Sequence, residues 1–146
     1  MKRTLSPAQA LATLLLGVGL VTAMSANAMA TTALPPEHMV GNVSYVSGGV
    51  GKDEADAMKQ AAARYPLELT FVTREKDGHE AYLAGDKVVV RDQEGRIVLN
   101  ARADGPFLLA KLPAGRYVVE AIDHGQAHKR SVTVVPDKHE RVVFAW

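Results

Sequence analysis

The stretch of this sequence that most resembles a ligand-binding loop is rich in glycine. It reads Ser47-Gly48-Gly49-Val50-Gly51-Lys52 and lies directly before a helical pattern. Backbone N–H groups of such a loop can hold a phosphate at a helix N-terminus. A phosphate loop of the Walker type needs Ser or Thr after its Lys, however, and here Asp53 and Glu54 follow Lys52. Because those carboxylates would repel an anion, we interpret the stretch as a structural turn whose glycines permit close approach or movement.

Two histidines have a spacing that suits a metal ion on a helix. His124 and His128 are four residues apart, but they lie in a predicted strand-turn-strand segment, where this spacing does not align two side chains as a helix would. A catalytic zinc site also needs a third protein ligand, which the sequence does not identify. We therefore expect a polar hairpin tip, with His124 and His128 as weak metal candidates, and we expect no cofactor.

The sequence offers few residues that could act as a catalytic nucleophile. The chain has no Cys, and Ser47 lacks the Gly two positions earlier that a nucleophile elbow requires. No other pattern indicates a catalytic set, so we predict that the protein is not an enzyme.

The N-terminus has the three regions of a cleavable signal peptide. Lys2 and Arg3 precede an apolar run over residues 10–23, and small residues follow in Ala26-Asn27-Ala28 and Ala28-Met29-Ala30. The run is shorter than the roughly 20 residues that cross a bilayer. We predict a signal peptide over residues 1–30, a mature start at Met29 or Thr31, and a soluble periplasmic or secreted protein with no membrane insertion.

Charge and cysteine content limit what the mature protein can be. The predicted signal peptide contains two basic residues and no acidic residue, so its removal changes the formal net charge from +1 to −1. A near-neutral protein gives no electrostatic reason to expect nucleic acid or acidic lipid as a partner. Without cysteine, an exported fold is held by burial and hydrogen bonds alone. Residues 31–41, with Pro35 and Pro36, are expected to form a flexible leader before one folded domain over residues 42–146.

Two kinds of apolar periodicity define the elements of that domain. Residues 42–66 are predicted to hold the glycine-rich loop and a short amphipathic helix over residues 51–65, with Ala55, Met58, Ala62 and Tyr65 on its apolar face. Residues 67–146 alternate with a period of two in short runs separated by Gly, Asp and Pro. These runs cover residues 67–71, 88–90, 97–101, 107–112, 117–121, 129–135 and 141–146. About seven short strands predict a mainly β, antiparallel sandwich with one helix.

Turn glycines and core-facing residues recur in a fixed order within these strands. They read Val88-x-Val90-x-Asp92-x-x-Gly95, then Asp104-Gly105-x-Phe107-x-Leu109-x-x-Leu112-Pro113-x-Gly115-x-Tyr117-x-Val119, then Gly125 and Val132-x-Val134. This pattern resembles the carboxypeptidase regulatory-like domain, a family with a transthyretin-like sandwich related in architecture to Cna-B modules of surface adhesins. The resemblance implies a fold and not an activity, because such modules are attached to enzymes, receptors and adhesins alike.

Two hypotheses about function follow from these patterns. The first is a non-enzymatic interaction or accessory module of the cell envelope, whose partner is an envelope protein and whose oligomeric state the sequence leaves open. Its candidate contact surface is the segment 45–53, which we read as lying outside the sandwich: Tyr45, Ser47, Gly48, Gly49, Gly51, Lys52 and Asp53. The second is a periplasmic ligand-binding or catalytic protein that uses the loop from Gly48 to Gly51. A deep polar pocket next to that loop would favour the second.

Overall fold

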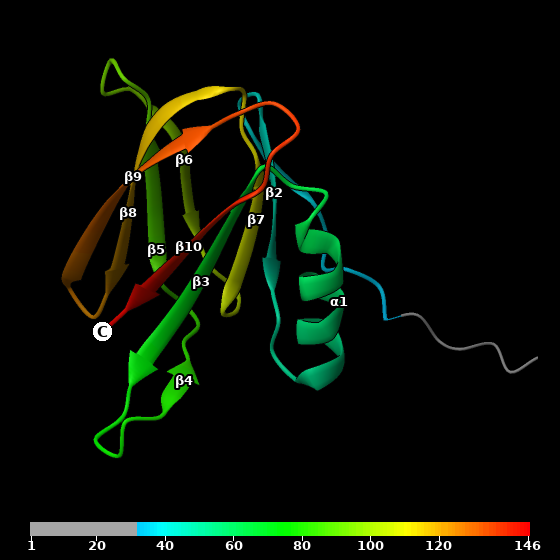
Figure 1. Cartoon of the computed structure of the whole chain (residues 1–146), viewed down its shortest axis with the longest axis vertical. Helices are drawn as coiled ribbons and strands as arrows, with labels where there is room; N and C mark the ends of the chain where they lie inside the picture. The colour runs from blue at the N-terminus through cyan, green and yellow to red at the C-terminus, as the bar shows by residue number, and fades with distance from the viewer. Residues whose placement is uncertain (1–31) are drawn as a thin grey trace, which may run out of the picture. The chain divides into compact units, whose positions relative to one another are not determined.

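The computed structural model describes residues 32–146, which contain ten strands and one helix (Figure 1). In chain order these are β1 (His38–Val40), β2 (Val43–Gly48), α1 (Lys52–Ala62), β3 (Leu67–Arg74), β4 (Glu80–Tyr82), β5 (Lys87–Arg91), β6 (Ile97–Arg102), β7 (Phe107–Lys111), β8 (Gly115–Asp123), β9 (Gln126–Val134) and β10 (Glu140–Ala145). The predicted mainly β sandwich with one helix is confirmed. The predicted signal peptide and its cleavage sites lie outside the described residues. No helix within residues 32–146 is long and apolar enough to span a bilayer.

The strands form two sheets. One has the order β1-β2-β7-β3-β10, with the short β4 paired to the far end of β3, and the other has the order β6-β5-β8-β9. All pairings are antiparallel except that between β3 and β10, which run parallel from Leu67 beside Glu140 to Val72 beside Ala145. The parallel pair arises because the chain crosses from β9 in one sheet to the edge of the other.

The start of β10 is attached to β3 by polar contacts as well as by the ladder. His139 places Nδ1 2.8 Å from the carbonyl oxygen of Tyr65 and Nε2 2.9 Å from Oε2 of Glu68. Arg141 Nε lies 3.4 Å from the other carboxylate oxygen of Glu68. These contacts supply partners for Glu68, a charged side chain that is almost fully buried.

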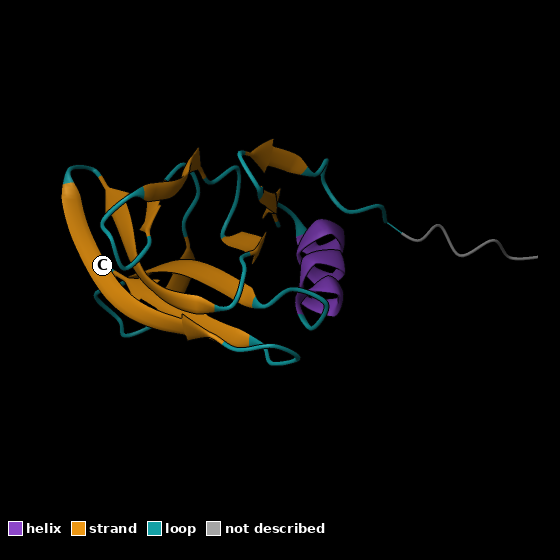
Figure 2. Ribbon diagram, turned by 90° about the horizontal axis from the view of Figure 1, so that it is seen from above, coloured by secondary structure: helices purple, strands orange, loops and turns teal. Residues whose placement is uncertain are grey.

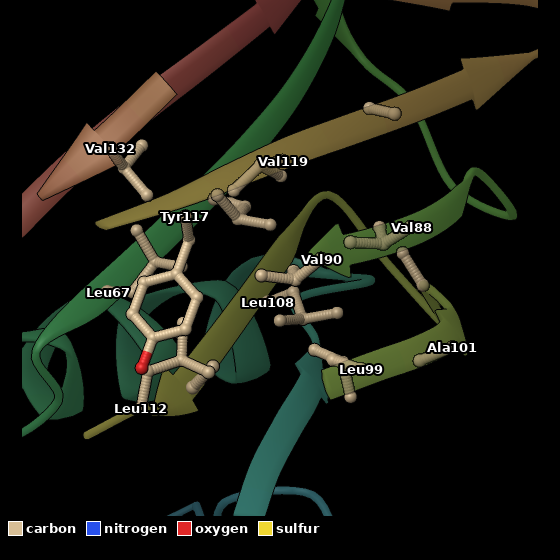
Figure 3. Close-up of a cluster of buried hydrophobic side chains, with 14 of the residues drawn as sticks. Leu67, Val88, Val90, Leu99, Ala101, Leu108, Leu112, Tyr117, Val119 and Val132 are labelled. Carbon is tan, nitrogen blue, oxygen red and sulfur yellow. The ribbon is translucent and has the colours of Figure 1, made fainter. Parts of the chain in front are cut away.

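The main hydrophobic core fills the space between the two sheets. Side chains at alternate positions point inward from every long strand, and Figure 3 shows part of this cluster, including Val88, Val90, Tyr117 and Val119. The predicted core residues Leu69, Phe71, Val132, Val134 and Phe144 are also buried, whereas Val142 is half-buried at the sheet edge. The period-two alternation therefore identified the inner faces correctly.

Helix α1 lies against the outer face of the sheet that contains β2 and β7 (Figure 2). Its apolar stripe of Ala55, Met58 and Ala62, together with Tyr65 just beyond the helix, is buried as predicted. This stripe packs on Val46, Phe107 and Leu109 and forms a second, smaller core. The helix ends at Ala62, three residues earlier than its apolar stripe indicated, and a turn continues to Tyr65.

One expectation about the candidate contact segment is wrong. Residues 45–53 were expected outside the sandwich, but Tyr45, Ser47 and Gly48 belong to β2, an interior strand paired with both β1 and β7. Only Gly49, Val50 and Gly51 form the connection to α1. Ser and Gly have weak strand propensity, and here pairing on both sides overrides that propensity.

Candidate functional site

The connection between β2 and α1 borders a groove with a volume of about 460 Å³. One wall is the turn of Gly49, Val50 and Gly51, and the second is the first two turns of α1. The third wall is the end of β4 and the residues after it. The full lining is Gly49, Val50, Gly51, Lys52, Ala55, Asp56, Lys59, Tyr82, Leu83 and Ala84. A chain segment far from the turn in sequence therefore completes the groove.

Two large apolar side chains stand exposed at this groove. Val50 is 64% exposed and Tyr82 is 54% exposed. The ring of Tyr82 rests on the buried ring of Phe107, with centroids 5.3 Å apart and planes inclined by 56°. Lys59 Nζ lies 5.8 Å from the centroids of both rings, within the range of a cation–π contact. The groove thus offers an aromatic surface fixed from below by the smaller core.

Charged groups on α1 line the same groove. Lys52 Nζ and Asp56 Oδ2 form an exposed ion pair of 2.6 Å one helical turn apart. Its hydrogen bond and charge lower the pKa of the Asp56 carboxyl and raise the pKa of Lys52, so both groups stay ionised near neutral pH. Such groups provide a polar rim around the apolar surface and no poised acid or base.

The turn itself is held rigidly. The Glu54 side chain reaches back from the first turn of α1 and accepts a 2.7 Å hydrogen bond from the Gly49 N–H. Gly49 has a φ of 101°, and a Cβ atom there would overlap the ring of Phe107. Glycine at this position therefore has a structural reason, and the geometry supports the turn interpretation made from the sequence.

The other candidate contact residues divide into structural and exposed groups. Ser47 is buried, donates a 3.1 Å hydrogen bond to the Phe107 carbonyl oxygen and accepts one of 2.9 Å from the Asp104 N–H. Gly48 touches the backbone near Gly105 so closely that a side chain at Gly105 would not fit. Lys52, Asp53 and Gly51 are exposed at the start of α1, beside the groove.

Tyr45 does not join this groove. Its side chain packs against the main core, whereas the side chain of Val46, the next residue in β2, packs against α1 in the smaller core. Its ring stacks on His38 with centroids 5.2 Å apart, and partial burial raises the pKa of its hydroxyl. The aromatic residue that actually stands at the groove is Tyr82, which sequence patterns did not single out because β4 is only three residues long.

The two histidines considered as metal ligands have separate partners. His124 is exposed in the β8–β9 turn with Nδ1 2.6 Å from Asp123 Oδ1, while His128 stacks on Trp146 at 5.0 Å. Within residues 32–146, no three His, Cys, Asp or Glu side chains meet in an arrangement suited to a metal ion.

A buried acid that the sequence analysis did not single out lies at the same end of the sandwich as the β8–β9 turn. Asp86 is 1% exposed, and neither of its carboxylate oxygens has a hydrogen-bond partner. It directly precedes Lys87, whose partner Ile122 in the β5–β8 ladder directly precedes Asp123. Burial first, then the charge and proximity of Asp123, raise the pKa of the Asp86 carboxyl to about 6, although His124 and Arg102 oppose the rise. Asp86 lies two residues before Val88, so period-two alternation places both side chains on the core face. This spacing could have predicted that Asp86 is buried.

Comparisons with known proteins assign no family to this chain. No family model matches the sequence, and no curated protein is significantly similar to it. Among solved structures, the TIE protein of Bacillus anthracis superposes with a TM-score of 0.42 and 13% sequence identity, over 55% of this chain and 16% of that one. This chain therefore matches only a small part of that protein.

Proposed function

We propose that this protein is a non-enzymatic interaction module of the cell envelope, and that it binds a protein partner through the groove between the Gly49–Gly51 turn, α1 and β4. The observation that carries the proposal is the exposure of Val50 and Tyr82 at one mainly apolar groove. Exposed aromatic side chains in preformed hollows are typical anchors of protein interfaces.

The rigid support of the groove favours binding without large rearrangement. Tyr82 rests on Phe107, and Glu54 holds the turn through Gly49, so little conformational freedom remains to be lost on association. The ion pair of Lys52 and Asp56 forms a polar rim of the kind that surrounds an interface core.

We also propose a fold family and a cellular location for this module. The pattern from Val88 to Val134 favours a carboxypeptidase regulatory-like, transthyretin-like module, and residues 1–30 favour export to the periplasm. Intact-mass measurement of protein from the periplasmic fraction tests the export step. A mature start at Met29 or Thr31 is expected, and full-length protein retained in the membrane would contradict it.

The contact surface is tested by site-specific photo-crosslinking in intact cells. A photoreactive amino acid replaces Tyr82 in one variant and Ile97 in a control, because Ile97 is 50% exposed on β6, in the other sheet. We expect a defined crosslinked protein from position 82 and none from position 97. Tyr82→Ala should then weaken binding of the purified partner by at least tenfold, whereas Ile97→Ala should not.

Equal crosslinking at both positions, or none at position 82, would contradict the proposed surface. The groove volume also lies within the usual range for small-molecule sites, which keeps the ligand-binding alternative open. A metabolite that raises the melting temperature of the wild type but not of Tyr82→Ala, in the absence of any protein partner, would favour that alternative.

A further inference from the structure

The outer face of the four-stranded sheet β6-β5-β8-β9 carries an unusual concentration of positive charge. Val88, Val90, Tyr117, Val119, Val132 and Val134 point into the core, so the residues between them point outward. We call the cations on this outward side the basic face. It consists of Lys87 and Arg91 on β5, Arg102 on β6, Arg116 on β8 and Lys129 on β9, all exposed.

Most of this charge is unpaired. Glu120 is the one acidic strand residue on this face, and it is occupied by Lys129 at 3.1 Å. No carboxylate among residues 32–146 forms an ion pair with Lys87, Arg91, Arg102 or Arg116. The basic face therefore retains a net positive charge, although the mature protein as a whole is nearly neutral.

The arrangement also works against the fold. Lys87 and Arg102 are direct cross-strand partners in the β5–β6 ladder, and like charges opposite each other destabilise a sheet. An external polyanion would relieve the repulsion between these two cations. This juxtaposition is the observation that points to a ligand.

We propose that the basic face binds the anionic surface of a lipid bilayer, by peripheral contact and without insertion. Its cations are spread over four strands, and Lys87 and Arg91 lie about 13 Å apart along β5, so they can meet several separate headgroup phosphates. Val118, 37% exposed and directly opposite Arg91 in the β5–β8 ladder, adds an apolar contact at the level of the headgroups. A narrow acidic peptide would engage one row of these side chains, whereas a flat anionic surface can engage all of them.

This binding leaves the groove free. Helix α1 covers the outer face of the other sheet (Figure 2). The groove beside α1 and the basic face therefore lie on opposite sides of the sandwich. A protein held at a membrane through Lys87, Arg91 and Arg116 would therefore present Tyr82 away from the lipid. Lipid binding by the basic face does not require a partner in the groove.

Cosedimentation with vesicles tests the proposal. The protein is purified in the form that cells produce. Intact-mass measurement defines its N-terminus, which must be the same in all variants. Wild type is expected to bind vesicles of equal phosphatidylglycerol and phosphatidylcholine at low salt, and to lose binding at high salt or on phosphatidylcholine alone. Each basic residue near an anionic surface is worth about a fivefold change in affinity, so Lys87→Gln with Arg116→Gln should weaken binding about 25-fold.

The matched control neutralises two exposed cations outside the basic face, with Lys76→Gln and Lys138→Gln. It produces the same change in net charge and should alter affinity less than about threefold. Equal losses in the two double variants, or salt-insensitive binding, would overturn the proposal. If soluble polyglutamate binds the basic face and anionic vesicles do not, the partner is an acidic polypeptide and the lipid assignment is wrong.

Discussion

Replacing the buried Asp86 by Asn should stabilise the protein at neutral pH. Asp86 is enclosed at the end of the sandwich, lies close to Asp123, and has no hydrogen-bonding partner for either oxygen of its carboxylate. An ionised carboxylate in such a place loses hydration without compensation. Asn keeps nearly the same volume, cannot ionise, and can donate an amide hydrogen bond to Asp123.

The pKa gives the size and the sign of the effect. Burial and Asp123 raise the pKa of Asp86 from its ordinary 3.8 to about 6 in the folded protein. Between these values the folded state binds more protons than the unfolded state, so the free energy of unfolding falls as pH rises. The stabilisation is fully present below pH 3.8 and is lost by about pH 6. At about 1.4 kcal/mol per pH unit, the loss amounts to about 3 kcal/mol.

Urea unfolding of wild type and Asp86→Asn at intervals between pH 4 and pH 8 measures this difference. The two proteins should be similar at pH 4, diverge as pH rises, and differ by about 3 kcal/mol at pH 7 in favour of the variant. Carboxylates distant from Asp86 titrate equally in both proteins and therefore cancel in the difference. Glu75→Gln, an exposed control, should run parallel to wild type. Parallel curves for Asp86→Asn and wild type would show that folding does not raise the pKa of Asp86.

Three further substitutions test the packing. Gly49→Ala should lower the free energy of unfolding by about 2 kcal/mol or more, because the new methyl group meets Phe107 and the backbone has a positive φ; an unchanged melting temperature would contradict this. Phe144→Ala should cost about 3 to 5 kcal/mol in denaturant unfolding, since it empties a fully buried site in the main core. Ser47→Ala should cost about 1 to 3 kcal/mol, because the Asp104 N–H loses its partner, and a variant as stable as wild type would show that water replaces the hydroxyl.

Local pattern was enough to predict most of the sandwich. Alternation placed Val88, Val90, Tyr117 and Val119 on inner faces, because a strand that buries one side must repeat every two residues. The helix followed from Ala55, Met58 and Ala62 for the corresponding reason. Asp86 belongs to the same alternation, so its burial could be predicted from the sequence. That its carboxylate has no hydrogen-bond partner could not be predicted.

Features decided by distant contacts could not be predicted from local pattern. The segment 45–48 looked like a loop because it combines serine and glycine, yet Ser47 is satisfied by Phe107 and Asp104, about sixty positions later. The groove was missed for the same reason, since Tyr82 reaches the glycine turn only after β4 pairs with β3. The basic face could not be predicted from the overall charge, which is near zero. Its cations share one face only because of the register of four strands.

The parallel pairing of β3 with β10 also has a consequence for the order in which the molecule can fold. Strand β3 lies between β7 and β10, and its partner residues 140–145 are synthesised more than seventy positions after residue 67. Strand β3 therefore keeps one edge open, and Glu68 lacks His139 and Arg141, until nearly the whole chain is available. Such long-range closure slows folding. If residues 1–30 direct export as proposed, this delay would keep the chain extended until translocation is complete.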